Sequence, residues 1–392
     1  MTSISIIGMG AVCSAGHGVD TCWPFVVAGT DGLAPLSTLD TGLKEAPLCA
    51  QAPLDPNEAL GEKLPNRTLG FSALAAAEAM QAAAGRNGLR LGVVAATTVA
   101  GMTRSERFFR TYLTDSSSAT HAARELRYHE PTTVTNELAR RYGATLTMTV
   151  STACSTGLHA IGMAKRLIER GRCDLCLAVG ADALSVLTIR GFASLTLLAP
   201  GGCKPFDKER AGISLGEGAG ALLLASDSAL QTLGTQPLAC VRGWGASADC
   251  HHMTAPHPEG KGAAAAVTAA LREASLEPSA IDLVAAHGTG TPDNDVAEVK
   301  ALRAALGTLP PFCSMKRSLG HTLGASGALE AVFAARAITE GVVPRTGGFD
   351  TLDEAIGAAP SAGEKKRIRH VLKNAFGFGG NNAAMIFSEV SA

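Results

Sequence analysis

The sequence is poor in aromatic residues and has no excess of either charge. Phenylalanine, tryptophan and tyrosine make up 4% of its 392 residues, which disfavours the stacking platforms that single-stranded nucleic acids need. Its 34 lysines and arginines nearly match its 35 aspartates and glutamates, so no global field attracts a polyanion. We therefore expect no nucleic-acid partner, and an acidic protein partner would need a local basic patch.

Long apolar runs are also missing. No stretch of about 18 apolar residues is present, and no charged segment followed by an apolar one opens the chain. The expectation is a cytoplasmic protein without a membrane partner. The ten cysteines lack the regular spacing of a disulfide framework, which is typical of reduced thiols in an intracellular enzyme. Cys173 and Cys176 resemble half of a metal motif, but no second pair accompanies them, so no metal site is expected.

Glycine, in contrast, is abundant. The 44 glycines, together with 46% hydrophobic and 18% charged residues, are typical of a well-packed enzyme with many tight turns. The glycines at positions 8, 10, 16 and 18 do not have the G-x-G-x-x-G spacing of a dinucleotide site. A nucleotide cofactor is therefore not expected at the first turn.

Strand-like and helix-like patterns alternate along the chain, and their order begins to repeat near residue 235. Strands that alternate with helices favour an α/β protein with parallel or mixed sheets covered on both faces. We expect two similar halves, residues 1–230 and 231–392, while the polar stretch 98–130 forms a cap that shapes the pocket. The sequence predicts strands at 4–8, 91–97, 173–180, 221–225, 281–286, 312–315, 368–376 and 383–387, and helices at 68–84, 155–170, 263–274, 295–306 and 323–340.

Cys154 lies where an apolar strand-like run meets a turn of small residues and then a helical pattern. A cysteine on the first turn of a helix faces unpaired N–H groups and the positive end of the helix dipole, which favour the thiolate. Because the thiolate is the reactive form, this position suits a nucleophile. On this stretch alone, a buried and inert cysteine is an equally good interpretation.

Two histidines occupy comparable places in the second half. His287 follows a strand-like run and precedes a glycine turn, and His321 lies between another such run and a helix start rich in small residues. Ligands of α/β proteins bind at strand ends. Each histidine alone is more often structural, but a cysteine and two histidines at three strand ends is a much rarer coincidence.

Four motifs together resemble the elongating β-ketoacyl-(acyl carrier protein) synthases of the thiolase superfamily. They are Thr-Ala-Cys-Ser at 152–155, His-Gly-Thr-Gly-Thr-Pro at 287–292, Lys-Arg-Ser-Leu-Gly-His at 316–321 and Phe-Gly-Phe-Gly-Gly-Asn-Asn at 376–382, with shorter matches at 205–207, 216–220 and 252–256. They span nearly the whole chain in the family's order. The resemblance implies a thiolase-like fold, in which two duplicated halves form a five-layered αβαβα sandwich.

The same resemblance implies a decarboxylative Claisen condensation that yields 3-oxoacyl-acyl carrier protein and carbon dioxide, in fatty acid or related biosynthesis. Cys154 would hold the primer acyl group as a thioester. His287 and His321 would promote the loss of carbon dioxide from malonyl-acyl carrier protein and stabilise the resulting enolate. The backbone N–H groups of Cys154 and Phe378 would receive the oxyanion that forms on the acyl carbonyl.

Lys316 and Glu330 match the family lysine and glutamate next to the second histidine. The resemblance implies that both orient the histidines and tune their protonation. Glu330 lies in a run of small residues at 324–329, which predicts that this glutamate is buried.

The remaining implied contacts concern the substrate. Thr289 and Thr291 match hydroxyls that bind the phosphopantetheine arm, which arrives on the acyl carrier protein, so no resident cofactor is implied. Phe376, Phe378 and Gly379 belong to a glycine loop at 377–380 in which Phe378 would swing as a gate.

The implied partners are acyl carrier protein and a second synthase chain. Acyl carrier protein is acidic, so we expect a basic patch at the pocket mouth, with Arg67, Lys204 and Lys208 as candidates. A homodimer is expected because the family's acyl pocket abuts the subunit interface. Ala211 stands where the family commonly has aspartate, and the cap is short for the family, so the chain-length preference is left open.

Several alternatives stay open at this point. The chain could be a polyketide or aryl-polyene ketosynthase that forms a heterodimer with a catalytically inactive chain-length partner. It could be that non-catalytic subunit, although retention of the cysteine, both histidines and Lys316 argues against this. A thiolase is disfavoured because it would need a second cysteine near the C-terminus, and no cysteine follows residue 320. An initiating synthase is disfavoured because such enzymes have asparagine at the third catalytic position, where this chain has His321.

Overall fold

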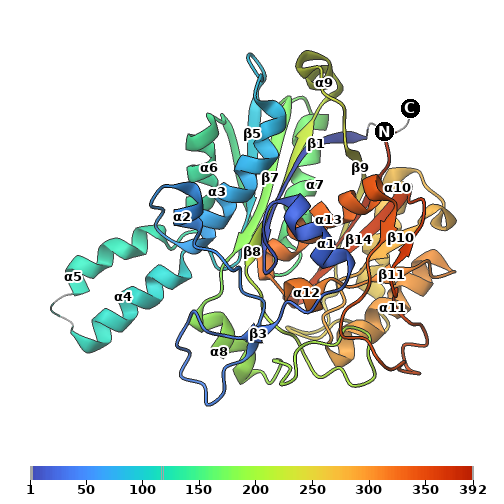
Figure 1. The fold of residues 1–392 in the computed structure, drawn as a ribbon. Coiled ribbons are helices and arrows are strands. Elements are labelled where there is room, and N and C mark those ends of the chain that lie inside the picture. Colours follow the sequence, from blue (N-terminus) through green and yellow to red (C-terminus); the bar gives the residue numbers. More distant parts are fainter. Residues whose placement is uncertain (1–2, 116, 118, 391–392) are drawn as a thin grey trace.

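A computed structural model describes residues 3–115, 117 and 119–390, in which eleven strands form one mixed sheet and four short strands form two separate pairs, β3–β4 and β12–β13 (Figure 1). Across this sheet the main strands lie in the order β6-β5-β7-β8-β1-β9-β15-β14-β10-β11, and the short β2 pairs with β1. Their bounds are β1 (Ile4–Cys13), β2 (Gly16–His17), β5 (Leu91–Ala96), β6 (Leu146–Val150), β7 (Leu175–Asp182), β8 (Gly218–Ala225), β9 (Ala239–Ala248), β10 (Leu283–Ala285), β11 (Phe312–Cys313), β14 (His370–Gly377) and β15 (Asn381–Ser388).

The two halves of the sheet repeat one topology. If the strands of the first half (β1, β5, β6, β7 and β8) are numbered 1 to 5 along the chain, their spatial order from the edge of the sheet to its middle is 3-2-4-5-1. The strands of the second half (β9, β10, β11, β14 and β15) have the same spatial order, 3-2-4-5-1. In both halves the second strand is parallel to the third and fourth, and the fifth is antiparallel to the fourth and first. The predicted duplication is therefore confirmed.

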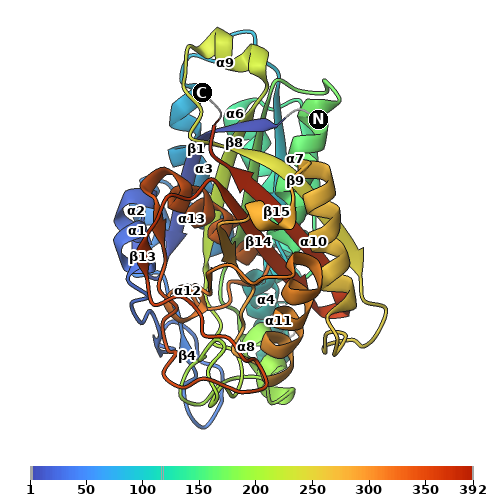
Figure 2. The same cartoon turned by 90° about the vertical axis from the view of Figure 1, so that its right-hand side faces the viewer.

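Helices lie in three layers around the sheet (Figures 1 and 2). The helices α3 (Arg67–Met80) and α6 (Thr132–Tyr142) cover the outer face of the first half, and α10 (Lys261–Ala274) and α11 (Pro292–Leu306) cover that of the second. The helices α7 (Thr156–Glu169) and α13 (Ser326–Glu340) lie between the two halves, where a shared apolar core surrounds them. The result is the αβαβα sandwich that the resemblance implies.

Glycines in β1 and β9 explain how closely the outer helices approach the sheet. A Cβ atom on Gly10 would lie 2.0 Å from the carbonyl oxygen of Ala75 in α3, and one on Gly245 would lie 1.9 Å from that of Ala266 in α10. Only glycine permits such contact between backbones, and the alanine-rich helices keep the facing surface flat. Gly8 and Gly10 therefore serve helix packing in the first half, and Gly245 does the same in the second.

The stretch 98–130 does not form the cap that we expected over the sheet. It forms α4 (Met102–Thr114), the short α5 (Ala119–Ala122) and a 3₁₀ segment, and the two helices project from the body as an arm (Figure 1). No residue of α4 is buried, and Phe109, Tyr112 and Leu113 are each at least 50% exposed. The prediction of a cap was wrong because a polar, amphipathic segment suits a projecting arm as well as a cover. The start of the stretch does shape a pocket, since Thr98, Val99 and Met102 line a cavity together with Cys154.

The remaining elements connect this framework. Several of them, including α1, α8 and α9, were not predicted because their helical patterns are short. They are α1 (Val19–Val27), β3 (Ala34–Pro35), β4 (Leu48–Cys49), α2 (Pro56–Leu60), α8 (Val186–Ser194), α9 (Asp227–Leu233), α12 (Lys316–Leu319), β12 (Val342–Val343) and β13 (Glu364–Lys365).

The boundary expected between residues 230 and 231 falls within α9, which links β8 to β9, and the division into two domains there stays a prediction. Over residues 3–115, 117 and 119–390, no helix has the length and apolar character required to cross a membrane.

Candidate active site

Cys154 lies in a sharp turn between β6 and α7, as the sequence predicts. The preceding residue, Ala153, has a φ of 53°, an uncommon conformation for a residue with a side chain. Side chains of the turn hold it in place: Ser155 Oγ donates to the carbonyl of Thr152 at 2.8 Å, and Thr156 Oγ1 accepts from the backbone N–H of Thr152 at 2.8 Å. The strained turn directs Cys154 into the space between the two halves of the sheet.

The Cys154 thiol is less acidic than the sequence suggested. Burial raises its pKa to about 11, although the backbone N–H groups of Phe378 and Cys154 and the charge of Lys316 lower it. The helix start alone therefore does not produce a resting thiolate, because desolvation of the charged form outweighs it. The N–H groups of Phe378 and Cys154 thus favour negative charge at the sulfur, as the donors of an oxyanion hole would.

His287 follows β10, and a buried carboxylate holds it through its backbone N–H group. The carboxylate of Glu298 in α11 accepts the N–H of His287 at 2.8 Å and that of Gly288 at 2.8 Å. The His287 ring packs edge-on against His321 and Phe376, with ring centroids 5.3 and 5.9 Å away. Its place at the end of a parallel strand is thus fixed by one buried carboxylate and by aromatic packing.

His321 lies in the turn before α13, and its tautomer follows from its contacts. Its Nδ1 accepts the backbone N–H of Leu323 at 3.2 Å, so in the neutral ring the proton is on Nε2. The backbone N–H of His321 donates to the carbonyl of Ser214 at 2.7 Å. The structure therefore presents Nε2–H of His321 as a hydrogen-bond donor.

Both imidazoles are neutral near pH 7. Burial lowers the pKa of His321 to about 3, and the charges of Lys316 and Lys373 act in the same direction, while Glu330 opposes them. Burial also lowers the pKa of His287 well below its usual value, with added contributions from Lys316, His321 and Lys373. Neutral rings donate N–H groups without an attached charge, which suits the stabilisation of a developing anion.

Behind the histidines, Glu330 binds two lysines. Lys316 Nζ lies 2.5 Å from Glu330 Oε1, and Lys373 Nζ lies 2.6 Å from Oε2. Burial alone would raise the pKa of Glu330, but the two ammonium charges outweigh it and hold the pKa at about 2. The burial of Glu330 predicted from its small neighbours is confirmed.

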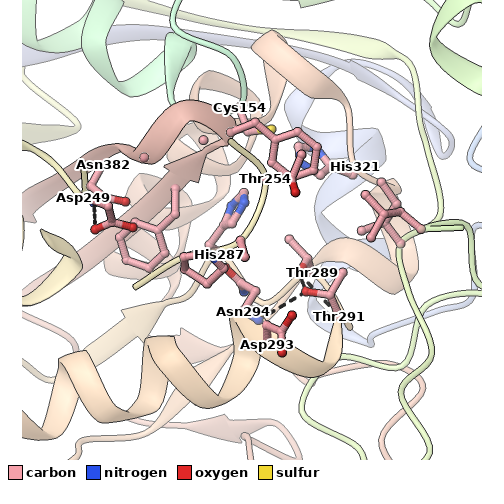
Figure 3. Close-up of a pocket in the computed structure, with 18 of the residues that line it drawn as sticks. Cys154, Asp249, Thr254, His287, Thr289, Thr291, Asp293, Asn294, His321 and Asn382 are labelled. Atoms are coloured by element: carbon pink, nitrogen blue, oxygen red, sulfur yellow. Dashed lines mark hydrogen bonds between the residues drawn. The ribbon is translucent and has the colours of Figure 1, made fainter. Parts of the chain in front are cut away.

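Cys154 lines two cavities, of which Figure 3 shows the first. The first has a volume of about 130 Å³ and contains Cys154, His287 and His321 in its lining. The second, of about 280 Å³, is almost wholly apolar and lies on the other side of Phe378 and Phe192. Those two rings, whose centroids are 5.6 Å apart, line both cavities, so they stand at the passage between them.

Most of the predicted substrate contacts line the first cavity. Thr289, Thr291, Phe376 and Phe378 do so, whereas Gly379 does not. The backbone N–H of Gly379 instead donates to the carbonyl of Met253 at 2.8 Å, outside the lining. Lys316 and Glu330 are also absent from the cavity wall and lie one layer behind it.

The basic candidates do not form a patch at the pocket mouth. Arg67 forms an ion pair with the buried Glu217 at 2.5 Å and does not line either cavity. Lys204 lies 3.1 Å from Glu209 and 3.7 Å from Asp350, so its charge is balanced within the chain. Lys208 is exposed on the surface. The acidic partners of Arg67 and Lys204 belong to the same chain, and the number and position of basic residues in the sequence did not reveal these pairings.

Cys173 and Cys176 are buried thiols beside Gly92 of β5. In the described part of the chain, no group of three or more histidine, cysteine, aspartate or glutamate side chains could hold a metal ion.

Three buried charged residues near the site were missed in the sequence. Asp182 at the end of β7 accepts N–H groups from Thr98 and from Gly324, so it ties both halves together beneath Cys154. Glu298 holds His287, as described above, and Lys373 binds Glu330. The sequence did contain a sign of Lys373, because this lysine interrupts the strand-like run 368–376, and a lysine is rarely buried without a partner.

Comparison with known proteins identifies related sequences across the whole chain. Residues 1–229 match the family model described as beta-ketoacyl synthase, N-terminal domain, and residues 238–350 match the beta-ketoacyl synthase, C-terminal domain. A 3-oxoacyl-(acyl-carrier-protein) synthase 2 from Vibrio cholerae is 30% identical, and the match covers 99% of each chain.

Solved structures agree with this comparison. The ishigamide ketosynthase/chain length factor is 29% identical with a TM-score of 0.92, over 99% of each chain. A type II polyketide synthase ketosynthase, solved with its acyl carrier protein and bound to the hexaketide, is 28% identical with a TM-score of 0.90, again over 99% of each chain. The likeness confirms the thiolase-like fold that was inferred from the motifs.

Proposed function

The chain belongs to the β-ketoacyl synthase family, and we propose that it condenses an acyl group held on Cys154 with malonyl-acyl carrier protein. The products are 3-oxoacyl-acyl carrier protein and carbon dioxide. The observation that carries this proposal is the convergence of Cys154, His287 and His321, from both halves of the chain, on one cavity.

In the first step the sulfur of Cys154 attacks the thioester carbonyl of the primer. The carbon–sulfur bond to the carrier breaks, and the proton of Cys154 ends on the released carrier thiol. The N–H groups of Phe378 and Cys154 face the sulfur and would stabilise the oxyanion that forms in between. Because the pKa of the resting thiol is raised to about 11, its proton must leave as the new bond forms.

In the second step the malonyl group loses carbon dioxide, and the electron pair of the broken carbon–carbon bond moves onto the thioester as an enolate. His321 presents its Nε2–H to the developing oxygen charge, and His287 lies beside it as a second neutral imidazole. The enolate carbon then attacks the acyl carbonyl on Cys154, and the thiolate leaves and regains a proton. Lys316 and Glu330 lie behind the histidines and would not contact the substrate; their ion pair sets the electrostatic environment of the two imidazole rings.

The acyl chain fits the almost wholly apolar cavity, and the carrier arm fits the other one, whose lining has more polar groups. The larger cavity contacts Cys154 and is lined by Val99, Met102 and Leu323, which suits a hydrocarbon chain. Phe378 lines both cavities, and as a gate it would control which of them is open to the Cys154 sulfur. Phe376 packs on His287 and would orient it, while Gly379 would act only as a hinge beside the gate.

Thr289 and Thr291 allow a test of how the phosphopantetheine arm is bound. Their hydroxyls lie 3.0 Å apart, and Thr291 also caps α11 by accepting the N–H of Asn294 at 3.3 Å. Thr289→Val is expected to raise KM for carrier thioesters about three- to tenfold, because it removes one substrate hydrogen bond. Its fall in Tm should be smaller than that of Thr291→Val, because only its contacts with the hydroxyl and N–H of Thr291 are lost. Thr291→Val is expected to raise KM and also to lower Tm, because it removes the cap. Steady-state kinetics and thermal melts distinguish them; an unchanged KM for Thr289→Val would contradict the assignment.

Acyl carrier protein and a second synthase chain are the partners of this enzyme. The edge of the sheet at β6 has no strand beyond it within the described residues, and an exposed strand edge favours pairing with another chain. The projecting α4–α5 arm exposes Phe109, Tyr112 and Leu113, which supports a further contact with that chain. A homodimer is our first expectation, and the cytoplasmic location stays a prediction.

A polyketide-type ketosynthase that works beside a chain length factor is the second candidate function. It is favoured by the structural likeness to the ishigamide ketosynthase/chain length factor at a TM-score of 0.92. In both functions the chemistry at Cys154 is the same, so the two differ in the primer and in the partner chain.

Mass spectrometry of the intact protein after incubation with a panel of acyl carrier thioesters tests both functions. We expect an added acyl mass that maps to Cys154. Loading of saturated acyl groups by the chain alone would support the fatty acid function, whereas loading only in the presence of a homologous chain that lacks the cysteine would support the polyketide function. Acylation at another residue, or at none, would contradict the assignment of the nucleophile.

A further inference from the structure

Lys373 is a fully buried lysine for which the proposed mechanism has no role. It lies in β14, the strand that leads into the glycine loop of Phe378, and none of its surface is exposed. Its Nζ lies 2.6 Å from Glu330 Oε2 and also donates to the carbonyl oxygens of Ala286 at 3.1 Å and Asn374 at 2.5 Å. An ammonium group has three N–H donors and no acceptor, so these three acceptors match its protonated form. Burial lowers the pKa of Lys373, while the charge of Glu330 opposes that effect.

Lys373 is connected to His287 through the backbone. Ala286, whose carbonyl it binds, is the residue directly before His287. Asn374, the next residue of β14, donates its side-chain N–H to Glu298 at 3.2 Å, and Glu298 accepts the N–H of His287. Two successive residues of β14 therefore hold the strand end from which the His287 ring projects.

Lys373 also adds a positive charge that Glu330 alone does not neutralise. Lys316 already pairs with Glu330 at 2.5 Å, so this cluster of two lysines and one glutamate has an excess of one positive charge. A nearby cation disfavours the protonated form of an imidazole. Removal of the Lys373 charge would leave Lys316 and Glu330 as an intact, neutral pair.

We propose that Lys373 is a positioning residue of the active site, which fixes the backbone before His287 and supplies a second positive charge that adds to burial in disfavouring protonation of both imidazoles. This inference rests on the proposed function insofar as the histidines take part in decarboxylation. The ionisable groups around the histidine pair, from every element packed against it, are Cys154 at the start of α7, Asp182 in β7, Asp249 after β9, Asp293 and Glu298 in α11, Lys316 in α12, Glu330 in α13 and Lys373 in β14.

The decisive comparison is Lys373→Met in a Cys154→Gln background, so that titration of the thiol does not contribute. Without the second cation, protonation of the histidines becomes easier. We expect the acidic limb of malonyl decarboxylation to move to higher pH by about one unit and kcat to fall about tenfold, with KM nearly unchanged. Lys373→Gln, which keeps an N–H donor for the Ala286 carbonyl, should show the same shift of the limb with a smaller loss of kcat.

Lys165→Met is the matched control. Lys165 is equally buried, with no exposed surface, but it pairs with Glu169 and Glu273 between α7 and α10 and lines neither cavity. This variant is expected to lower Tm and to leave the acidic limb in place. Identical limbs in the Lys373→Met variant and its parent would overturn the inference, even if Tm falls.

Failure of the proposed function would be recognised separately. If the Cys154→Gln parent releases no carbon dioxide from malonyl-acyl carrier protein, the function is wrong. The role of Lys373 is then judged from proton–carbon NMR titration of histidines labelled at Cε1, where the His287 or His321 midpoint must rise in Lys373→Met. Unmoved midpoints there would again overturn it.

Discussion

Replacement of Cys154 by glutamine is expected to lower condensation by about a thousandfold or more, while malonyl decarboxylation persists or increases. The variant lacks the sulfur that holds the primer, so no acyl-enzyme forms. Its side-chain amide oxygen can accept the N–H groups of Phe378 and Cys154 that face the sulfur, and so imitate the acyl carbonyl. The histidine pair is left unchanged, because His287 and His321 are held from the other half of the chain.

Release of labelled carbon dioxide and formation of 3-oxoacyl product, measured in parallel, separate the two activities. Cys49→Ala is a suitable control, since burial raises the pKa of that thiol to about 12 and it lines neither cavity. It should retain both activities. Normal condensation by Cys154→Gln would show that the nucleophile is a different residue.

His321→Ala is expected to lower decarboxylation by about a hundred- to a thousandfold, the usual cost of one lost oxyanion donor. The Nε2–H of His321 is available to the substrate because Nδ1 accepts the N–H of Leu323. Alanine removes this donor and leaves the enolate oxygen with His287 alone. Acylation of Cys154 should be much less affected, since its oxyanion contacts are backbone N–H groups.

The two half-reactions are therefore measured separately, acylation by mass spectrometry and decarboxylation by carbon dioxide release. His370→Ala serves as the control, because His370 lies at the far end of β14 and contacts Ser388 at 2.8 Å. Unchanged carbon dioxide release by His321→Ala would remove this residue from the enolate site.

The framework and the three central residues could be predicted from the sequence because they follow local patterns. Apolar runs such as β8, and β7 up to its final Asp182, are buried on both faces, and the alanine-rich α3 and α10 have clear helical spacing. Cys154, His287 and His321 follow strand-like runs, so their meeting at one end of the sheet follows from topology.

Properties that depend on partners distant in sequence could not be predicted. The acidity of Cys154 is set by desolvation between the two halves, which no local pattern records. Arg67 was a candidate for the basic patch that would bind acyl carrier protein, but its guanidinium pairs with Glu217, 150 positions away in the same chain. Lys373 was overlooked for the same reason, because its three acceptors come from β14 itself, from the end of β10 and from α13.

The repeated strand order also shows how differently the two halves use one position. Thr97, after β5, occupies in the first half the place that His287 occupies after β10 in the second. The His287 imidazole lines the cavity at Cys154, whereas the Thr97 hydroxyl donates to Asp182, which also accepts the N–H groups of Val99 and Gly324. The same place in the topology therefore supplies a reactive side chain in one half and a stabilising hydrogen-bond network in the other.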